Sequence, residues 1–221
     1  MNKKIVINIE STLKPFNRYF QTSIGACHAY LTLREDFRQH VRQVQEKIGF
    51  QHIRCHGIFH DWVGCYQELD GEPFYNFQNV NKIYDFFVKQ GLKPYVELSF
   101  MPEQLASSDA SIFRYKANIS PPKNMEKWCD LVAHFVRHLI GRYGLDEVKS
   151  WYFEVWNEPD LQHSFWSGTQ NDYFELYKYT SRVIKKIDPK IKVGGPSTSK
   201  NQWISEFLDY CQTHELSVDF V

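Results

Sequence analysis

The chain has 221 residues, and its 26 basic side chains balance its 26 acidic ones, so its formal net charge is zero. This balance gives no electrostatic reason to expect a nucleic-acid partner or an anionic membrane surface. Hydrophobic residues make up 43% and aromatic residues 16% of the sequence. A chain of this composition can bury a sizeable core, which argues against wholesale disorder.

The N-terminal segment carries two lysines, Lys3 and Lys4, but lacks the apolar stretch and the small-residue cleavage site of a secretory signal peptide. No run of about 18 apolar residues is present, so we expect no membrane-spanning helix. The cysteines are odd in number and form no Cys-x-x-Cys pair; they are Cys27, Cys55, Cys65, Cys129 and Cys211. Reduced thiols in a cytoplasmic protein fit these observations best.

Short apolar runs alternate along the chain with segments of helical periodicity. The runs predict six strands, at residues 23–27, 51–57, 93–99, 151–157, 192–196 and 218–221. Between them, apolar side chains recur every three or four residues and predict helices at residues 37–48, 83–90, 128–139, 173–187 and 204–211. Alternation of this kind implies an α/β fold with a parallel sheet and right-handed crossovers.

The predicted parallel sheet can be open or closed into a barrel. The Gly-x-Gly-x-x-Gly motif of dinucleotide-binding sheets is absent, and so is a P-loop, so we expect no nucleotide cofactor. The strands carry charges in their middles, which open sheets rarely tolerate, whereas a barrel interior can hold a polar layer. We therefore predict a (β/α)8 TIM barrel truncated in its sixth strand, since a complete barrel has eight strands and about 250 residues. The long loop at residues 101–122 should help to build its site.

Three charged residues, Arg54, Glu97 and Glu154, each lie between two apolar neighbours in a predicted strand. Successive strand residues point to opposite faces, so the apolar neighbours should face the helices and the charges the barrel interior. Unpaired charges would be costly there, and we therefore expect Arg54 to bond at least one of the two glutamates. The alternative is a shift of one residue, which would place these charges in solvent.

The strand predicted at residues 151–157 ends in Asn157-Glu158-Pro159. Proline cannot donate to a strand ladder, so pairing ends there and Glu158 lies at the carboxyl end of the strand, where barrel enzymes hold their catalytic groups. Glycoside cleavage needs a carboxylic acid that protonates the leaving oxygen and a second carboxylate that acts as nucleophile or base. Glu158 fits the first role; the alternative is a solvated loop glutamate.

The sequence around this motif resembles the β-xylosidases of glycoside hydrolase family 39, in the clan of retaining barrel glycosidases. The matching stretches run in family order: GFQHIRCHGIFHD (49–61), PFYNF (73–77), KPYVELSFMP (93–102), SPPKNMEKW (120–128), RYGLDEVKSWYFEVWNEPDL (142–161), KVGGPS (192–197) and VDFV (218–221). The resemblance implies that Glu158 is the general acid/base and that Asn157 binds the sugar. It also implies that His56 and Phe113 line the subsite of the cleaved sugar.

The resemblance further implies hydrolysis of terminal β-xylosidic bonds in xylo-oligosaccharides, or of another small glycoside, without a cofactor or metal. The family nucleophile is a glutamate at the end of strand 7, and the predicted strands here reach only strand 6. We therefore expect the isolated chain to be inactive. Family members also have a small β-sandwich, so residues 1–14 are expected to supply its N-terminal strand, at residues 4–10, and residues 15–221 the incomplete barrel. Homo-oligomerisation of the complete enzyme is left open.

Histidines and tryptophans offer further candidate ligands. His52, His56 and His60 recur every four residues, but on a strand and its following loop this spacing does not gather them on one face, so we interpret them as packed or surface residues rather than metal ligands. Trp156 and Trp166 could each stack on a sugar. Trp166 is the better candidate because it lies in a loop after the strand that carries Glu158.

Two other functions compete with a β-xylosidase. An α-L-iduronidase belongs to the same family, but its substrate carries a carboxylate, so extra Arg or Lys side chains near the subsite would indicate it. A carbohydrate-binding protein without catalysis is the second alternative. The carboxylic acid at Glu158 argues against it, because binding alone needs no acid.

Overall fold

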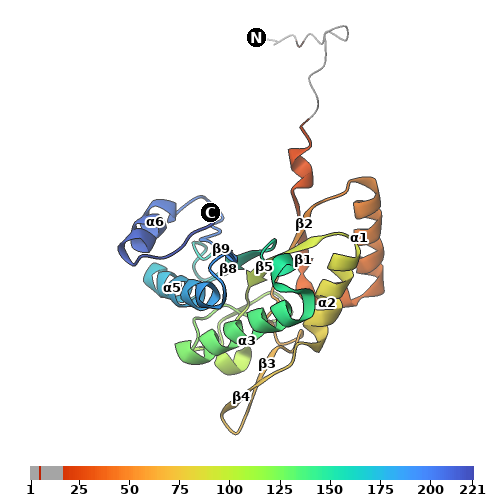
Figure 1. Ribbon diagram of the computed structural model, residues 1–221. Coiled ribbons are helices and arrows are strands. Elements are labelled where there is room, and N and C mark those ends of the chain that lie inside the picture. Colours follow the sequence, from red (N-terminus) through yellow and green to blue (C-terminus); the bar gives the residue numbers. More distant parts are fainter. Residues whose placement is uncertain (1–4, 6–16) are drawn as a thin grey trace.

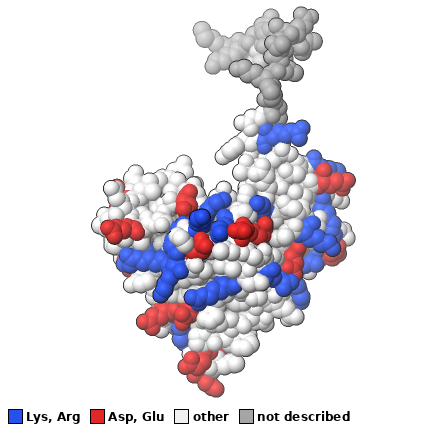
Figure 2. Space-filling model, in the orientation of Figure 1, with Lys and Arg blue, Asp and Glu red and all other residues white. Residues whose placement is uncertain are grey.

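The structure, a computed structural model, describes Ile5 and residues 17–221. Apart from Ile5, the strand expected at residues 4–10 lies outside the described residues and stays a prediction. Within the described part of the chain, no helix is both long and apolar enough to cross a lipid bilayer. On the face shown in Figure 2, basic and acidic side chains are interspersed rather than gathered by sign, in keeping with the neutral net charge.

Five parallel strands form the central sheet and lie side by side in the order in which they occur along the chain. They are β1 (Ser23–His28), β2 (His52–His56), β5 (Lys93–Leu98), β8 (Tyr152–Val155) and β9 (Lys192–Gly194). Each coincides with a predicted strand to within two residues. The prediction of an α/β fold with a parallel sheet is confirmed, and the described residues form an open sheet rather than a closed barrel.

The segment at residues 218–221 is not a regular strand, so the prediction of a sixth strand there is wrong for this structure. It does lie beside β9, because the N–H of Asp219 donates to the carbonyl of Val193 at 2.9 Å. The N–H of Val193, however, donates to the carboxylate of Asp219 at 2.7 Å instead of to a backbone carbonyl. Pro196, just after β9, has no N–H to offer. The N–H of Gly195 also donates to the carbonyl of Phe220, at 3.4 Å, so the two segments are joined without a regular ladder.

Helices follow the strands and form an arc around them in chain order (Figure 1). They are α1 (Glu35–Lys47), α2 (Gln78–Lys89), α3 (Met125–Tyr143), the single turn α4 (Leu145–Val148), α5 (Gln170–Ile187) and α6 (Ile204–Thr213). Each predicted apolar stripe lies on one of them. Where α3 packs on α5, the indole N–H of Trp128 donates to Thr180 at 2.8 Å. A capping box between Thr169 and Asp172 begins α5 and satisfies backbone groups that the helix leaves free.

Two short antiparallel hairpins interrupt the alternation, and the sequence reasoning did not predict them. The first pairs β3 (Tyr66–Leu69) with β4 (Glu72–Tyr75) after β2, and the second pairs β6 (Ser111–Ile112) with β7 (Ala117–Asn118) after β5. Asp70 and Gly71 make the first turn with φ of 52° and 84°. Asp-Gly is a strong signal for a two-residue hairpin turn, because both positions need a left-handed backbone.

Candidate active site

The candidate site lies at the carboxyl end of β8. The strand ends at Val155, and Trp156, Asn157 and Glu158 follow it. Trp156 and Glu158 have left-handed backbones, with φ of 70° and 46°. Residues other than glycine adopt such angles rarely, and those that do cluster at functional sites. The N–H of Glu158 donates to the carbonyl of Ser197 at 3.1 Å, so the ends of β8 and β9 are joined at this residue.

Arg54 lies between two buried carboxyl groups, as the alternation of strand faces predicted. Its Nε donates to Oε2 of Glu154 at 2.6 Å, and its Nη2 lies 2.8 Å from Oε2 of Glu97. Nη2 also donates to Oδ1 of Asn157 at 2.9 Å, which orients that amide. Glu97 is 0% and Glu154 is 4% exposed. The predicted inward-facing charged layer is therefore confirmed, and it is bonded directly to a candidate site residue.

The carboxyl groups of Glu154 and Glu158 hold their protons more tightly than usual. Burial raises the pKa of Glu154 to about 8, although Arg54 opposes the rise and Glu97 adds to it. One guanidinium balances only one of two buried carboxylates, which favours a retained proton. Burial also raises the pKa of Glu158, and the carboxylate of Asp160 adds to this rise. A raised pKa keeps a carboxyl group protonated closer to neutral pH, as a general acid requires.

His56 ends β2, one strand removed from β8 in the sheet. Its Nε2 lies 2.9 Å from the hydroxyl of Tyr115, and its ring stacks with that of Phe113 at a centroid distance of 6.0 Å. Burial lowers the pKa of His56, so the ring is neutral near pH 7. Gly57, the next residue, has a left-handed backbone with a φ of 75°, and a Cβ there would come within 2.8 Å of the His28 ring. The two residues that the resemblance assigns to one subsite are thus in contact.

Tyr115 belongs to this ring cluster, although the sequence reasoning did not select it. Its ring stacks on His28 at 4.5 Å and lies 5.0 Å from Phe113. His60 holds the loop that carries Tyr115. Its Nδ1 accepts the N–H of Trp62 at 3.1 Å, so its Nε2 carries the proton. Nε2 then donates to the carbonyl of Tyr115 at 2.9 Å. The available signal was a pair of aromatic residues, at positions 113 and 115, within one polar loop. The loop therefore brings both rings against His56.

Trp166 does not take part in this surface. It is 0% exposed, its indole N–H donates to the carbonyl of Thr169 at 2.9 Å, and its ring packs against Trp156 at 5.0 Å. The expectation that Trp166 stacks on a sugar is therefore wrong, because no face of the ring is accessible. A loop position does not keep an aromatic ring exposed when other rings, here Trp156 and Tyr173, cover it.

Two histidines of α3, His134 and His138, each have one polar partner. Nε2 of His138 lies 2.6 Å from Oδ1 of Asn81, and Nδ1 of His134 lies 2.8 Å from the carbonyl of Asp130. Among the residues that the structure describes, no three His, Cys, Asp or Glu side chains are grouped so that they could hold a metal ion. These contacts agree with the interpretation of the histidines as packed or surface residues.

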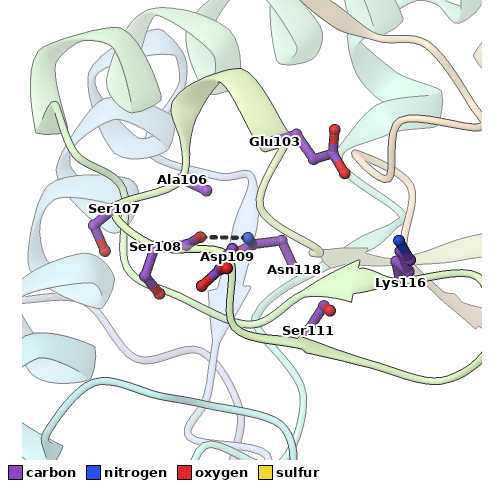
Figure 3. Close-up of a pocket in the computed structure, with 8 residues that line it drawn as sticks. All are labelled: Glu103, Ala106, Ser107, Ser108, Asp109, Ser111, Lys116 and Asn118. Atoms are coloured by element: carbon purple, nitrogen blue, oxygen red, sulfur yellow. Dashed lines mark hydrogen bonds between the residues drawn. The ribbon is translucent and has the colours of Figure 1, made fainter.

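A polar hollow of about 610 Å³ lies within the loop between β5 and α3 (Figure 3). The amide of Asn118 crosses it and donates to the carbonyl of Ser108 at 2.6 Å. Its lining contains neither an aromatic ring nor any of the candidate site residues; it consists of Glu103, Ala106, Ser107, Ser108, Asp109, Ser111, Lys116 and Asn118. Small-molecule sites combine apolar walls with a few polar groups, so this hollow is a weaker candidate than the carboxyl end of β8.

A parallel α/β sheet that carries Asn157 and Glu158 at one strand end and His56 at another has the arrangement of a glycoside hydrolase catalytic domain. The chain belongs to glycosyl hydrolases family 39, whose family model matches residues 3–221. This result confirms the resemblance found in the sequence.

Individual relatives agree with the family assignment. A β-xylosidase of Caldicellulosiruptor saccharolyticus is 45% identical over 219 residues, which are 99% of this chain and 45% of that protein. The solved structure of a family 39 β-xylosidase from Caulobacter crescentus matches with a TM-score of 0.89 and 42% identity, over 96% of this chain and 48% of that one. An α-L-iduronidase of Homo sapiens is 34% identical over 153 residues, which are 68% of this chain and 22% of that protein. The chain spans less than half the length of each relative.

Proposed function

We propose that the chain provides the general acid/base, Glu158, of a retaining β-xylosidase acting on terminal xylosides of xylo-oligosaccharides. The observation that carries the proposal is the position of Glu158, at the carboxyl end of β8 with its pKa raised by burial. Beside it, Arg54 orients the amide of Asn157. A carboxyl group in this state can protonate the leaving oxygen, and an amide beside it can bond the sugar 2-hydroxyl. The sugar class follows the β-xylosidases among the relatives.

The architecture of this proposal is a (β/α)8 barrel of which the chain supplies the first part. The five sheet strands follow one another as barrel strands do, and residues 218–221 lie beside β9 in the place of a sixth. Residues 1–14 would supply one strand of a β-sandwich. Because the order of strands in space equals their order in the chain, further strands would continue from this edge and close on β1.

Retention requires a second carboxylate about 5–5.5 Å from Glu158 across the sugar. Glu97 and Glu154 do not fit this role, since both are buried beneath the rim and bonded to Arg54. We therefore expect the nucleophile on a strand that this chain does not contain, and the 221-residue chain alone to be inactive.

The charges near the site favour a neutral sugar over an iduronide. An iduronide carries a carboxylate and would need a free cation close to the subsite. Arg54, the cation that bonds Asn157, is already engaged by Glu97, Glu154 and Asn157 itself. Comparing turnover of an aryl β-xyloside with that of an aryl α-L-iduronide tests this preference, and faster turnover of the iduronide would reverse it.

Replacement of Glu158 by alanine tests the acid/base role in the natural full-length protein that carries this sequence. For xylosides with poor leaving groups, kcat/KM should fall about 100- to 10,000-fold, because these substrates need protonation in the transition state. For activated aryl xylosides, the rate of the glycosylation step should fall much less. Glu206→Ala, at an exposed position of α6, is the matched control and should change kcat/KM for neither kind of xyloside. Equal losses for both leaving groups would contradict the assignment, and no loss would point to a binding protein or to another acid.

A further inference from the structure

A continuous polar network crosses the sheet near the carboxyl ends of its strands. It begins at Ser197, which follows β9 and whose hydroxyl donates to Oε1 of Glu154. The other oxygen of Glu154 accepts from Nε of Arg54 at 2.6 Å, and Arg54 continues to Glu97 at 2.8 Å. A branch from Arg54 reaches Oδ1 of Asn157 at 2.9 Å. One network therefore joins the ends of β9, β8, β2 and β5.

We propose that Ser197 is a positioning residue for the general acid and for the sugar-binding amide, acting through two different atoms. Its carbonyl oxygen accepts the N–H of Glu158 at 3.1 Å. Its hydroxyl donates to Glu154, which leads through Arg54 to Asn157. The proposal rests on the proposed role of Glu158, and it does not require Ser197 to touch the substrate.

The backbone contact matters because both of its partners are conformationally strained. Glu158 has a φ of 46° and Ser197 a φ of 49°, in the left-handed region that side chains disfavour. Such angles persist only where the surroundings fix them. The bond between Ser197 and Glu158 ties the two strained residues together, so the direction of the Glu158 side chain depends on the end of β9 as well as on β8.

The hydroxyl contact matters because Glu154 is almost completely buried and each of its oxygens needs a donor. Arg54 supplies one donor and Ser197 the other. Without the hydroxyl, Oε1 loses its hydrogen-bond partner, so Arg54 alone holds the buried carboxyl group and the group can shift relative to Arg54. Asn157 then loses the donor that orients its amide. Ser197 itself then keeps only the backbone hydrogen bond to Glu158, so its carbonyl holds Glu158 less firmly.

Two substitutions separate the hydroxyl from the backbone, in the natural full-length protein that carries this sequence. Ser197→Ala and Ser197→Gly both remove the hydroxyl, but glycine accepts a left-handed φ without strain and so keeps the fold intact. In both variants, kcat/KM for a xyloside with a poor leaving group should fall about 10- to 100-fold, the effect of a misplaced catalytic group. For the activated aryl xyloside, kcat/KM should fall clearly less. The alkaline limb of the pH profile should move to lower pH, because a displaced Glu158 is better solvated and its pKa falls.

The controls distinguish positioning from loss of stability and from failure of the proposed function. Ser205 is exposed on α6, and Ser205→Ala should leave kcat/KM for both xylosides unchanged. Suppose that Glu158→Ala shows the leaving-group dependence, but Ser197→Gly lowers kcat/KM equally for both xylosides or for neither of them. The positioning role is then refuted, while the acid assignment stands. If wild-type activity in Ser197→Gly accompanies a defect in Ser197→Ala, only backbone strain matters and the proposal is again refuted. If Glu158→Ala itself shows no leaving-group dependence, both proposals fall.

Discussion

Replacement of Arg54 by methionine would remove the guanidinium from two buried carboxyl groups while keeping an unbranched side chain. Glu97 and Glu154 are 0% and 4% exposed, so water cannot replace the lost donors. Breaking a buried ion pair by removing one partner costs about 3–5 kcal/mol of unfolding free energy. At about 2–4 °C per kcal/mol for a protein of this size, the melting temperature should fall by about 6–20 °C.

The loss should depend on pH, with a sign that Glu154 determines. Burial raises its pKa from 4.5 to about 8, so between these values the folded state keeps a proton that the unfolded state has released. The contribution of Glu154 to stability therefore falls as the pH rises through this window. Arg54 lowers this pKa, so its removal raises the pKa further and extends the fall in stability to higher pH. The destabilisation by Arg54→Met should thus be smaller near pH 5 than near pH 8.

Thermal unfolding followed by circular dichroism at both pH values measures this difference. Arg142→Met is the matched control, because Arg142 of α3 pairs with Asp85 of α2 at 2.5 Å but the two side chains are 39% and 44% exposed. Surface pairs of this kind contribute about 0.2–1 kcal/mol. A loss for Arg54→Met that is equal at both pH values, or no larger than that of the control, would refute the reasoning from a buried network.

Two further substitutions test the packing of the site. Gly57→Ala should lower the unfolding free energy by about 1–3 kcal/mol, because the residue has a left-handed backbone and a Cβ would meet His28 at 2.8 Å; an unchanged urea midpoint would show that His28 yields without cost. Trp166→Phe should lower the unfolding free energy by about 1–3 kcal/mol through the unpaired carbonyl of Thr169 and the lost ring volume, without raising KM. A raised KM with unchanged stability would restore a sugar contact for Trp166.

The strands and the interior charges could be predicted from the sequence because they depend on local periodicity. Successive strand residues alternate between faces whatever the surrounding fold, so apolar neighbours on both sides of Arg54, Glu97 and Glu154 were enough to assign their direction. The desolvation cost of a buried charge then required a partner, and the structure provides both glutamates. Pro159 indicated that a strand end was near Glu158, but β8 ends earlier than expected, at Val155.

Features that depend on tertiary contacts could not be predicted in this way. The exposure of Trp166 depends on whether neighbouring rings cover it, and no local pattern encodes that. Tyr115 joins the site because His60 bonds its carbonyl across two loops. At residues 218–221 the apolar run was correct, but the carboxylate of Asp219 takes the N–H that a regular ladder would use. The hairpin at Asp70-Gly71 differs from these features, because the Asp-Gly pair is a local turn signal from which it could have been predicted.

The order of the strands also has a consequence for how the chain folds. In space, β1, β2, β5, β8 and β9 follow one another as they do along the chain, so each new strand pairs with the sheet strand that precedes it. No pairing skips a strand of the sheet, which limits the loop-closure entropy of each step. A ribosome delivers the chain from its N-terminus, so the sheet can grow one strand at a time as the polypeptide emerges. Arg54 is then the first member of the buried network to be placed, and its two carboxyl partners arrive only when β5 and β8 dock.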